Sequence, residues 1–251
     1  TLMTLGKNPE LLVIGYLYNQ GFIKKKNDLK SIQVDWDIES AVVVTNGGIS
    51  NLEKRLEKRT VTSGCGQGTV FGDMMEDLDN IKLNPPALRQ SSFYRLLKNI
   101  REYNEVYKKS GAVHGCALCI DENIEKFIED VGRHNATDAI AGYMLLEEID
   151  GSDKLFYTTG RLTSEMIIKV AKMGIPILFS RAGITKMGLE LSQKLGVTTI
   201  SRAAGKHFLV YNGADTVIYD AKPKEKTGSR FNTSENSEES NDDDRRRGAE
   251  L

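Results

Sequence analysis

The sequence predicts an α/β fold in which a sheet packs against helices. Between residues 112 and 220, short apolar segments of strand type alternate with segments of helical spacing, and this order is typical of an α/β sandwich with parallel strands. The chain has 251 residues, of which 39% are hydrophobic, enough for one large or two smaller domains with cores. After Asp220 the composition becomes polar and charged. We therefore expect a smaller N-terminal α+β part over residues 1–84, an α/β domain over 85–220 and a polar tail over 221–251.

The N-terminal part begins with a predicted helix. Asn8 is placed to cap it, Pro9 suits its first turn, and Gly21 suits its end. Apolar residues repeat at helical spacing in between, namely Leu12, Val13, Tyr16 and Leu17. The apolar run Ala41–Thr45 predicts a strand. Residues 72–84 are acidic and weakly patterned, so we predict no element there.

The second part opens with a helix that begins at Pro85-Pro86 and ends at Gly111. Its expected buried stripe consists of Phe93, Leu96, Leu97, Ile100 and Tyr103. Strands then follow at Ala112–Ile120, Ile124–Val131, Lys154–Thr159, Ile175–Ser180, Val197–Arg202, His207–Asn212 and Thr216–Asp220. Helices are expected at Asn135–Glu147, Thr163–Met173 and Thr185–Leu195. The tail from Lys222 onward has too few apolar residues to offset the entropy of ordering, so we expect it to be disordered.

Composition limits the partners and the compartment. A formal net charge of −1 gives no global field that would draw the chain to nucleic acid or to a membrane surface. The longest apolar runs are too short to span a bilayer, and the N-terminus does not resemble a signal peptide. Three cysteines do not make a disulfide framework, so we expect a reducing, cytoplasmic setting. Because the chain opens with Thr1 rather than Met, we also expect that some N-terminal sequence is missing.

One cysteine lies in a glycine-rich stretch, Ser63-Gly64-Cys65-Gly66-Gln67-Gly68. Glycine lets the backbone turn tightly and lift a neighbouring side chain into the open. Free cysteine is otherwise among the most buried residue types, so a thiol on such a loop suggests reactivity. The other reading is a turn whose cysteine is incidental. The stretch alone favours neither.

Arginines follow several of the predicted strands directly: Arg133, Arg161, Arg181 and Arg202. In open α/β sheets, ligands bind outside the carboxyl ends of the strands, and the forked guanidinium suits phosphate or carboxylate. If the strand order brings these ends together, they form a crevice for a multiply anionic ligand such as a nucleotide or a pterin dinucleotide. The alternative is four separate surface arginines that pair with nearby acids.

Polar residues are dense in Glu129-Asp130-Val131-Gly132-Arg133-His134-Asn135. His134 is a candidate for general acid–base catalysis or phosphate binding. The alternative is that Asp130, His134 and Asn135 satisfy one another and cap the helix that follows.

The chain also contains a C-x-x-C pair, Cys116 and Cys119, in a predicted strand. Residues three apart on a strand face opposite sides, so a disulfide or a shared metal does not form easily. A second C-x-x-C or His pair for structural zinc is missing. We interpret both cysteines as core residues and predict no metal site.

Several blocks together resemble one family. They are Gly111-Ala112-Val113-His114, the Glu129–Ala136 block with Asp138, Gly160–Glu165, Gly174–Arg181 and Val210-Tyr211-Asn212-Gly213. Over about Pro9 to Tyr211 the chain resembles the formate dehydrogenase accessory sulfurtransferase family (FdhD). The resemblance implies a cytidine deaminase-like three-layer α/β sandwich with a smaller N-terminal part, and a tendency to dimerise.

The resemblance also implies a function. A loop cysteine, here Cys65, takes persulfide sulfur from a cysteine desulfurase. It passes the sulfur to the molybdenum cofactor in its bis(molybdopterin guanine dinucleotide) form, which is then inserted into the formate dehydrogenase catalytic subunit. The family's cofactor-binding segment falls on Arg202, Ala203, Ala204, Gly205, Lys206 and His207. We add Arg133, His134, Arg161 and Arg181 to the expected cofactor contacts, and we expect GDP or another guanine nucleotide to mimic the cofactor.

Two departures from the family pattern bear on the mechanism. Many relatives carry C-x-x-C in the loop, whereas this chain has Gly68 at the second position, which favours a single persulfide on Cys65. The usual N-terminal strand segment is also missing. Two other functions stay open: a chaperone that only holds the cofactor or its target enzyme, and a nucleotide hydrolase. No P-loop lysine or metal-binding carboxylate cluster supports the hydrolase.

Overall fold

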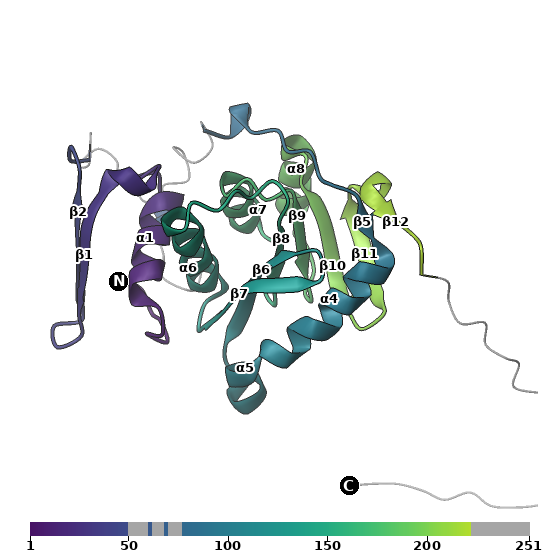
Figure 1. Cartoon of the computed structure of the whole chain (residues 1–251), viewed down its shortest axis with the longest axis horizontal. Coiled ribbons are helices and arrows are strands. Elements are labelled where there is room, and N and C mark those ends of the chain that lie inside the picture. Colours follow the sequence, from purple (N-terminus) through teal and green to yellow (C-terminus); the bar gives the residue numbers. More distant parts are fainter. Residues whose placement is uncertain (50–59, 62–67, 70–76, 222–251) are drawn as a thin grey trace, which may run out of the picture. The chain divides into compact units, whose positions relative to one another are not determined.

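A six-stranded sheet is the centre of the computed structural model, which describes residues 1–49, 60–61, 68–69 and 77–221 (Figure 1). Its strands are β6 (His114–Ile120), β7 (Asn123–Asp130), β8 (Leu155–Thr158), β9 (Ile177–Ser180), β10 (Thr198–Ala204) and β11 (His207–Asn212). They lie in the order β11-β10-β9-β8-β6-β7. Each strand falls within two residues of its predicted bounds, so the predicted alternation of strands and helices is confirmed.

The sheet is mixed, so the expectation of parallel strands is correct for only part of it. Only β8, β9 and β10 pair in parallel, while β6 is antiparallel to both β7 and β8, and β11 is antiparallel to β10. The cause is the length of two connections. Two residues join β6 to β7, and two join β10 to β11, whereas a parallel crossover needs a dozen or more residues. The mixed α/β class itself is confirmed.

Helices cover both faces of this sheet. On one face lie α6 (Arg133–Leu146), α7 (Ser164–Lys172) and α8 (Lys186–Leu195), which share a core with residues such as Leu118, Phe156 and Leu178. On the other face lies α4 (Gln90–Tyr103), which packs on alternate strand residues such as Ala117, Tyr157 and Phe179. The helices therefore enclose the sheet, as the period-two alternation of buried side chains requires. The closer likeness to cytidine deaminase stays an expectation.

The segment before Gly111 differs from its prediction. The helix predicted from Pro85-Pro86 begins only at Gln90, because residues 88–89 form β5 (Leu88–Arg89), which pairs with β12 (Val217–Ile218). Proline disfavours the helical conformation of the residue before it, which agrees with an extended start. Asn104 then interrupts the helix, and α5 (Glu105–Ser110) ends at Gly111 with φ +64°. Tyr103 is 46% exposed, so its place in the buried stripe is wrong.

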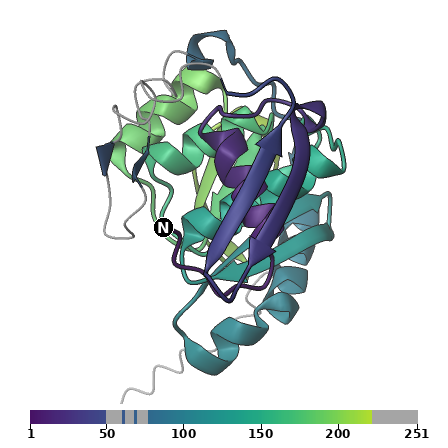
Figure 2. The same cartoon turned by 90° about the vertical axis from the view of Figure 1, so that its left-hand side faces the viewer.

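The N-terminal helix α1 (Pro9–Asn19) forms where it was predicted, although the Asn8 side chain makes no capping hydrogen bond. It packs closely on α6. Gly15 and Gly142 make this possible. A Cβ on Gly15 would lie 1.6 Å from the Asp138 carbonyl oxygen, and one on Gly142 would lie 2.0 Å from the Leu11 carbonyl oxygen. Outside α1 lies an antiparallel hairpin of β1 (Leu29–Asp35), which was not predicted, and β2 (Ser40–Thr45), which was (Figure 2).

The remaining described elements are short. They are β3 (Thr60–Val61), β4 (Gly68–Thr69) and three 3₁₀ turns at Lys26–Asp28, Asp77–Asn80 and Ala214–Thr216. The last turn and β12 replace the strand predicted over Thr216–Asp220. Residues Thr1–Ala221 form one compact unit; the expected limit at residue 84 stays a prediction, and the expected tail lies outside the described residues. No helix of the described part is long and apolar enough to cross a bilayer.

Candidate functional site

The strand order brings the arginine-bearing strand ends to one edge of the sheet. Strands β8, β9 and β10 run in the same direction, and β7 shares it because β6 is antiparallel to both β7 and β8. Arg133, Arg161 and Arg181 follow the carboxyl ends of β7, β8 and β9, and Arg202 lies near the end of β10. The condition set for an anionic crevice is therefore met at the level of the backbone. Of the four arginines, however, only Arg181 lines the two pockets described below.

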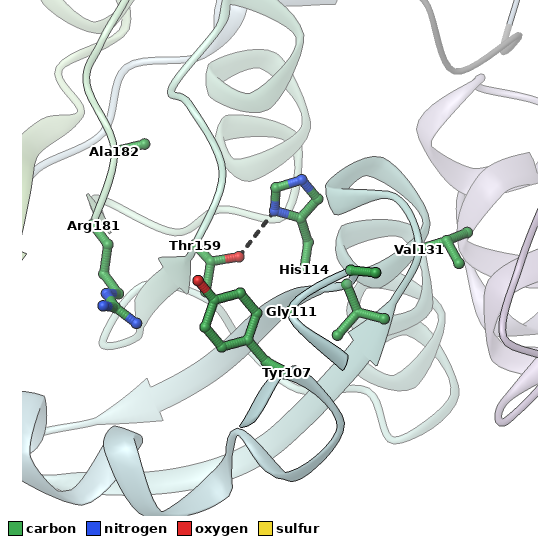
Figure 3. Close-up of a pocket in the computed structure, with 9 residues that line it drawn as sticks. Tyr107, Gly111, His114, Val131, Thr159, Arg181 and Ala182 are labelled. Atoms are coloured by element: carbon green, nitrogen blue, oxygen red, sulfur yellow. Dashed lines mark hydrogen bonds between the residues drawn. The ribbon is translucent and has the colours of Figure 1, made fainter. Parts of the chain in front are cut away.

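Two pockets at this edge are lined by described residues, and the larger, shown in Figure 3, has a volume of about 570 Å³. Arg181 reaches it from the end of β9 and His114 from the start of β6, while Tyr107 comes from α5. The full lining consists of Tyr107, Gly111, Ala112, Val113, His114, Val131, Thr159, Arg181 and Ala182. It combines apolar and aromatic walls with a guanidinium, an imidazole and a hydroxyl, a composition typical of ligand pockets.

His114 is fixed in this pocket by Thr159. The Thr159 hydroxyl oxygen lies 3.0 Å from Nδ1 of His114 and accepts a hydrogen bond of 3.1 Å from the Gly115 backbone N–H. Partial burial, followed by the positive charge of Arg133, lowers the pKa of His114. The imidazole is therefore uncharged at neutral pH and offers a hydrogen-bonding group rather than a cation. The sequence reading did not select His114, although it stands in the Gly111–His114 block.

A second pocket, of about 320 Å³, lies against α4 and the turn between β10 and β11. Its lining consists of Leu97, Ile100, Arg101, Asn104, Tyr157, Arg181, Ala203, Ala204 and Gly205. Three residues of the expected 202–207 segment thus line a pocket, and Arg181 lines both pockets. Four expected contacts are exposed and line neither of these two pockets: Arg161, Arg202, Lys206 and His207. Their role in cofactor binding stays a prediction.

The acidic residues of the Glu129–Asn135 block hold other segments in place. Both carboxylate oxygens of Glu129 accept hydrogen bonds from the first turn of α5, at 2.9 Å from the Val106 N–H and 2.8 Å from the Tyr107 N–H. Glu129 therefore fixes the short helix that carries Tyr107 into the larger pocket. Its neighbour Asp130 accepts hydrogen bonds from Thr4, Leu5 and the Asn135 amide.

Asn135 also forms a hydrogen bond with the N-terminal segment. Its amide donates to the Met3 carbonyl oxygen as well as to Asp130, at 2.9 Å. For Asp130 and Asn135, the alternative in which the polar residues satisfy one another is therefore the better description. The block joins residues 3–5 to the start of α6.

The two basic residues of the block differ in their surroundings. The aliphatic part of the Arg133 side chain passes over Gly160, where a Cβ would lie 2.3 Å from its Cδ, and its Nε is buried without a hydrogen-bond partner among the described residues. His134 is only 3% exposed, and its Nε2 lies 3.2 Å from Oε2 of Glu165. Burial, followed by the positive charges of Lys169 and Arg133, lowers the pKa of His134 to about 2. Neither residue lines the two pockets, so their binding role stays a prediction.

Lys169 and Asp138 form a buried ion pair. Nζ of Lys169 lies 2.8 and 2.9 Å from the two carboxylate oxygens of Asp138, and the Asn19 amide donates to the same carboxylate at 2.7 Å. Asp138 is completely buried and Lys169 is 2% exposed. The contacts join α1, α6 and α7, so we regard them as structural.

The three cysteines lie in different settings. Cys116 and Cys119 are fully buried on opposite faces of β6, one in each core cluster, which confirms their interpretation as core residues. Burial raises the pKa of Cys116 to about 11 and raises that of Cys119 further. Cys65 lies outside the described residues, between β3 and β4, in which Val61 pairs with Gly68.

Comparisons with known proteins agree on one family. A sequence model of the FdhD/NarQ family matches residues 1–218. Curated relatives named Sulfur carrier protein FdhD include one from Bacillus pumilus, 32% identical and covering 80% of this chain and 77% of the relative, and one from Bacillus licheniformis, 30% identical and covering 87% and 84%. Among solved structures, a protein from Desulfotalea psychrophila described as a formate dehydrogenase accessory protein matches with a TM-score of 0.69 and 26% identity, over 86% of this chain and 82% of that one.

Proposed function

This chain belongs to the FdhD/NarQ family, and from that premise we propose that it carries sulfur for the maturation of formate dehydrogenase. In this proposal Cys65 accepts persulfide sulfur from a cysteine desulfurase. The sulfur then passes to the molybdenum cofactor, bis(molybdopterin guanine dinucleotide), before the cofactor enters the formate dehydrogenase catalytic subunit. The name of the curated relatives supports the carrier role.

The burial of two of the three cysteines is the observation that carries the proposal. A sulfur carrier needs an accessible thiolate, because the thiolate and not the thiol attacks a persulfide. Cys116 and Cys119 are closed off in the core, and their raised pKa values keep them protonated. Of the three cysteines in the sequence, only Cys65 is left for this chemistry. The single thiol agrees with one sulfur atom carried at a time.

The loading step balances without an added oxidant or reductant. The Cys65 thiolate attacks the outer sulfur of the desulfurase persulfide, a new S–S bond forms on Cys65, and the S–S bond on the desulfurase breaks. The electron pair of the broken bond stays on the desulfurase cysteine, which leaves as a thiolate and takes up a proton. Sulfur is thus transferred with its oxidation state unchanged.

We propose the carboxyl edge of the sheet as the place where the molybdenum cofactor is received as a substrate. The two pockets fit an elongated anionic ligand because Arg181 lines both and no acidic residue is among the described residues that line them. Ala203, Ala204 and Gly205 would approach it through the backbone. Arg133, His134, Arg161, Arg202, Lys206 and His207 are further proposed contacts. We also propose that the protein acts in the cytoplasm and forms a homodimer. GDP is proposed to bind as a mimic of one half of the cofactor.

Mass spectrometry of the intact protein after incubation with a cysteine desulfurase and cysteine tests the carrier role. We expect wild type to gain the mass of one sulfur atom, Cys65→Ala to gain none, and Cys119→Ala, which keeps Cys65, to load like wild type. Equal loading of Cys65→Ala and wild type contradicts the proposal. If Cys65→Ala still supports formate dehydrogenase activity in cells, the protein acts instead as a chaperone that holds the cofactor without passing sulfur.

A further inference from the structure

Thr159 lies where β6 and β8 meet, and its hydroxyl faces His114. The backbone N–H of Thr159 donates to the Gly115 carbonyl oxygen at 2.9 Å, and the Gly115 N–H donates to the Thr159 hydroxyl oxygen at 3.1 Å. These two bonds hold the hydroxyl oxygen 3.0 Å from Nδ1 of His114 (Figure 3). The position of the hydroxyl is therefore set by the backbone, and its proton remains to be placed.

The available hydrogen-bond partners decide where this proton points. A hydroxyl has one O–H donor, and a neutral imidazole has one protonated and one unprotonated nitrogen. The Gly115 N–H already donates to the Thr159 oxygen, and Nδ1 of His114 is the only acceptor that the described residues offer to the Thr159 proton. A proton on Nδ1 would leave the hydroxyl without that acceptor. The network therefore favours an unprotonated Nδ1 and a proton on Nε2.

The second ring nitrogen, Nε2, is open to the larger pocket, which His114 lines. It forms no hydrogen bond with the described residues, and it is not among their buried polar atoms that lack a partner. Figure 3 shows it on the side of the ring that faces away from Thr159. The lowered pKa of His114 keeps the ring uncharged at neutral pH, so Nε2–H is a neutral donor.

The walls around this donor supply few acceptors for it. The described residues that line the larger pocket include no aspartate or glutamate, and Arg181 has only donors. The two side chains with ring or guanidinium N–H groups, His114 and Arg181, thus both present hydrogens. A ligand in this pocket has to supply the acceptors, because a buried donor without a partner is unfavourable.

We propose that His114 binds a hydrogen-bond acceptor of the ligand through its Nε2–H, and that Thr159 positions His114 by accepting the Gly115 N–H and donating to Nδ1. The ligand group at this point carries an exposed lone pair, as a carbonyl oxygen, a ring nitrogen or a phosphate oxygen does. The inference rests on the proposed function only in taking this edge of the sheet as a ligand site. It adds a donor atom, its protonation and the residue that fixes both.

Nitrogen NMR of the whole chain, with isotope-labelled histidine, tests where the proton is. The chain has three histidines, so His114→Phe identifies the His114 signals by their loss. At neutral pH we expect an unprotonated Nδ1 and a protonated Nε2 in wild type and in Thr159→Ser, which keeps the hydroxyl. In Thr159→Val neither tautomer is held, so the two nitrogen shifts should move toward each other. A protonated Nδ1 in wild type, or an unchanged pattern in Thr159→Val, overturns the proposal.

GDP, the mimic named in the proposed function, is the probe for the donor role. On binding, it should shift the Nε2 signal of His114. In calorimetry, His114→Phe, which keeps a ring without a donor, should weaken GDP about fivefold, the equivalent of one hydrogen bond. Thr159→Val should weaken GDP about twofold, because the donor tautomer then makes up about half of the molecules, and Thr159→Ser should bind like wild type. Wild type that binds GDP without a shift at Nε2, or that does not bind GDP, overturns the donor role.

The double variant separates positioning from direct contact. If Thr159 acts through His114, then Thr159→Val combined with His114→Phe should bind GDP as weakly as His114→Phe alone. A further loss in the double variant would show that Thr159 contacts the ligand by itself, which overturns its role as the positioning residue. Sulfur loading of Cys65 gives an independent measurement. If loading fails while GDP shifts Nε2 of His114, the carrier function fails and this inference stands; loading without that shift gives the reverse.

Discussion

Adding one methyl group at Gly15 is expected to separate α1 from the rest of the fold. Alanine is normally the better helix former, by about 0.5–1 kcal/mol. Here its Cβ would lie 1.6 Å from the Asp138 carbonyl oxygen and 2.6 Å from the Gly142 nitrogen. Both are backbone atoms of α6, so no side chain can rotate away to make room.

The size of the effect follows from these distances. Ordinary contacts begin at 3.4 Å, so α1 would have to withdraw by about 1.8 Å. Overpacking of this kind costs about 1–3 kcal/mol, and backbone contacts belong at the upper end. The shift also strains the Asn19 hydrogen bond to Asp138 at the end of α1. After the gain in helix propensity is subtracted, we expect Gly15→Ala to lower the free energy of unfolding by about 2 kcal/mol.

Urea and thermal unfolding of the whole chain measure this loss. A loss of this size lowers Tm by about 4–8 °C for a protein of this length. Gly183→Ala is the matched control, because a Cβ there meets nothing within 4 Å and its φ is not positive. It should be neutral or slightly stabilising. If Gly15→Ala is as stable as Gly183→Ala, the close crossing of α1 and α6 is refuted.

Three further predictions concern buried titratable groups. Lys169→Met should lower the free energy of unfolding, measured in urea, by about 3–5 kcal/mol, because it leaves the buried Asp138 carboxylate without its cation. A decrease of less than about 1 kcal/mol would contradict a stabilising ion pair. The pKa of His134 is lowered in the folded protein from its ordinary value of 6.5. Below pH 6.5 the imidazole therefore takes up a proton only in the unfolded state, which stabilises that state. Wild-type stability should therefore fall from pH 6.5 to 5 by about 1.4 kcal/mol per unit more than that of His134→Gln, and parallel pH profiles would argue against a neutral, buried His134. Glu129→Gln should speed amide hydrogen exchange in α5 about tenfold through the weakened cap, and unchanged exchange there would show that other contacts hold α5.

Local signals were enough to predict most elements of the sheet and its helices. Pro9, Gly111 and the period-two and period-3.6 patterns gave bounds within a few residues. The short connection at Asp121-Glu122 indicates that β6 and β7 are antiparallel, whereas we expected parallel strands. The strand β1 was missed because Lys30, Gln33 and Asp35 interrupt its apolar pattern on a hairpin that is largely exposed.

The site was predicted in part, for a different reason. Arginines after strands can be read along the chain, so the shared edge was found. That only Arg181 among them lines both pockets depends on where each loop turns after its strand. His114 and Tyr107 approach Thr159 and Arg181 only when β6 pairs with β8 and when Glu129 holds α5. Contacts between residues this far apart in the chain cannot be predicted from local sequence patterns.

The placement of Cys116 and Cys119 on opposite faces of β6 has a practical consequence for labelling. While the protein stays folded, a maleimide dye has two of the three thiols closed to it, so any rapid labelling reports on Cys65. Unfolding adds two reactive thiols at once. The number of dyes bound per chain therefore serves as a count of folded molecules, and a fluorophore can be attached near the glycine loop without first removing the native cysteines.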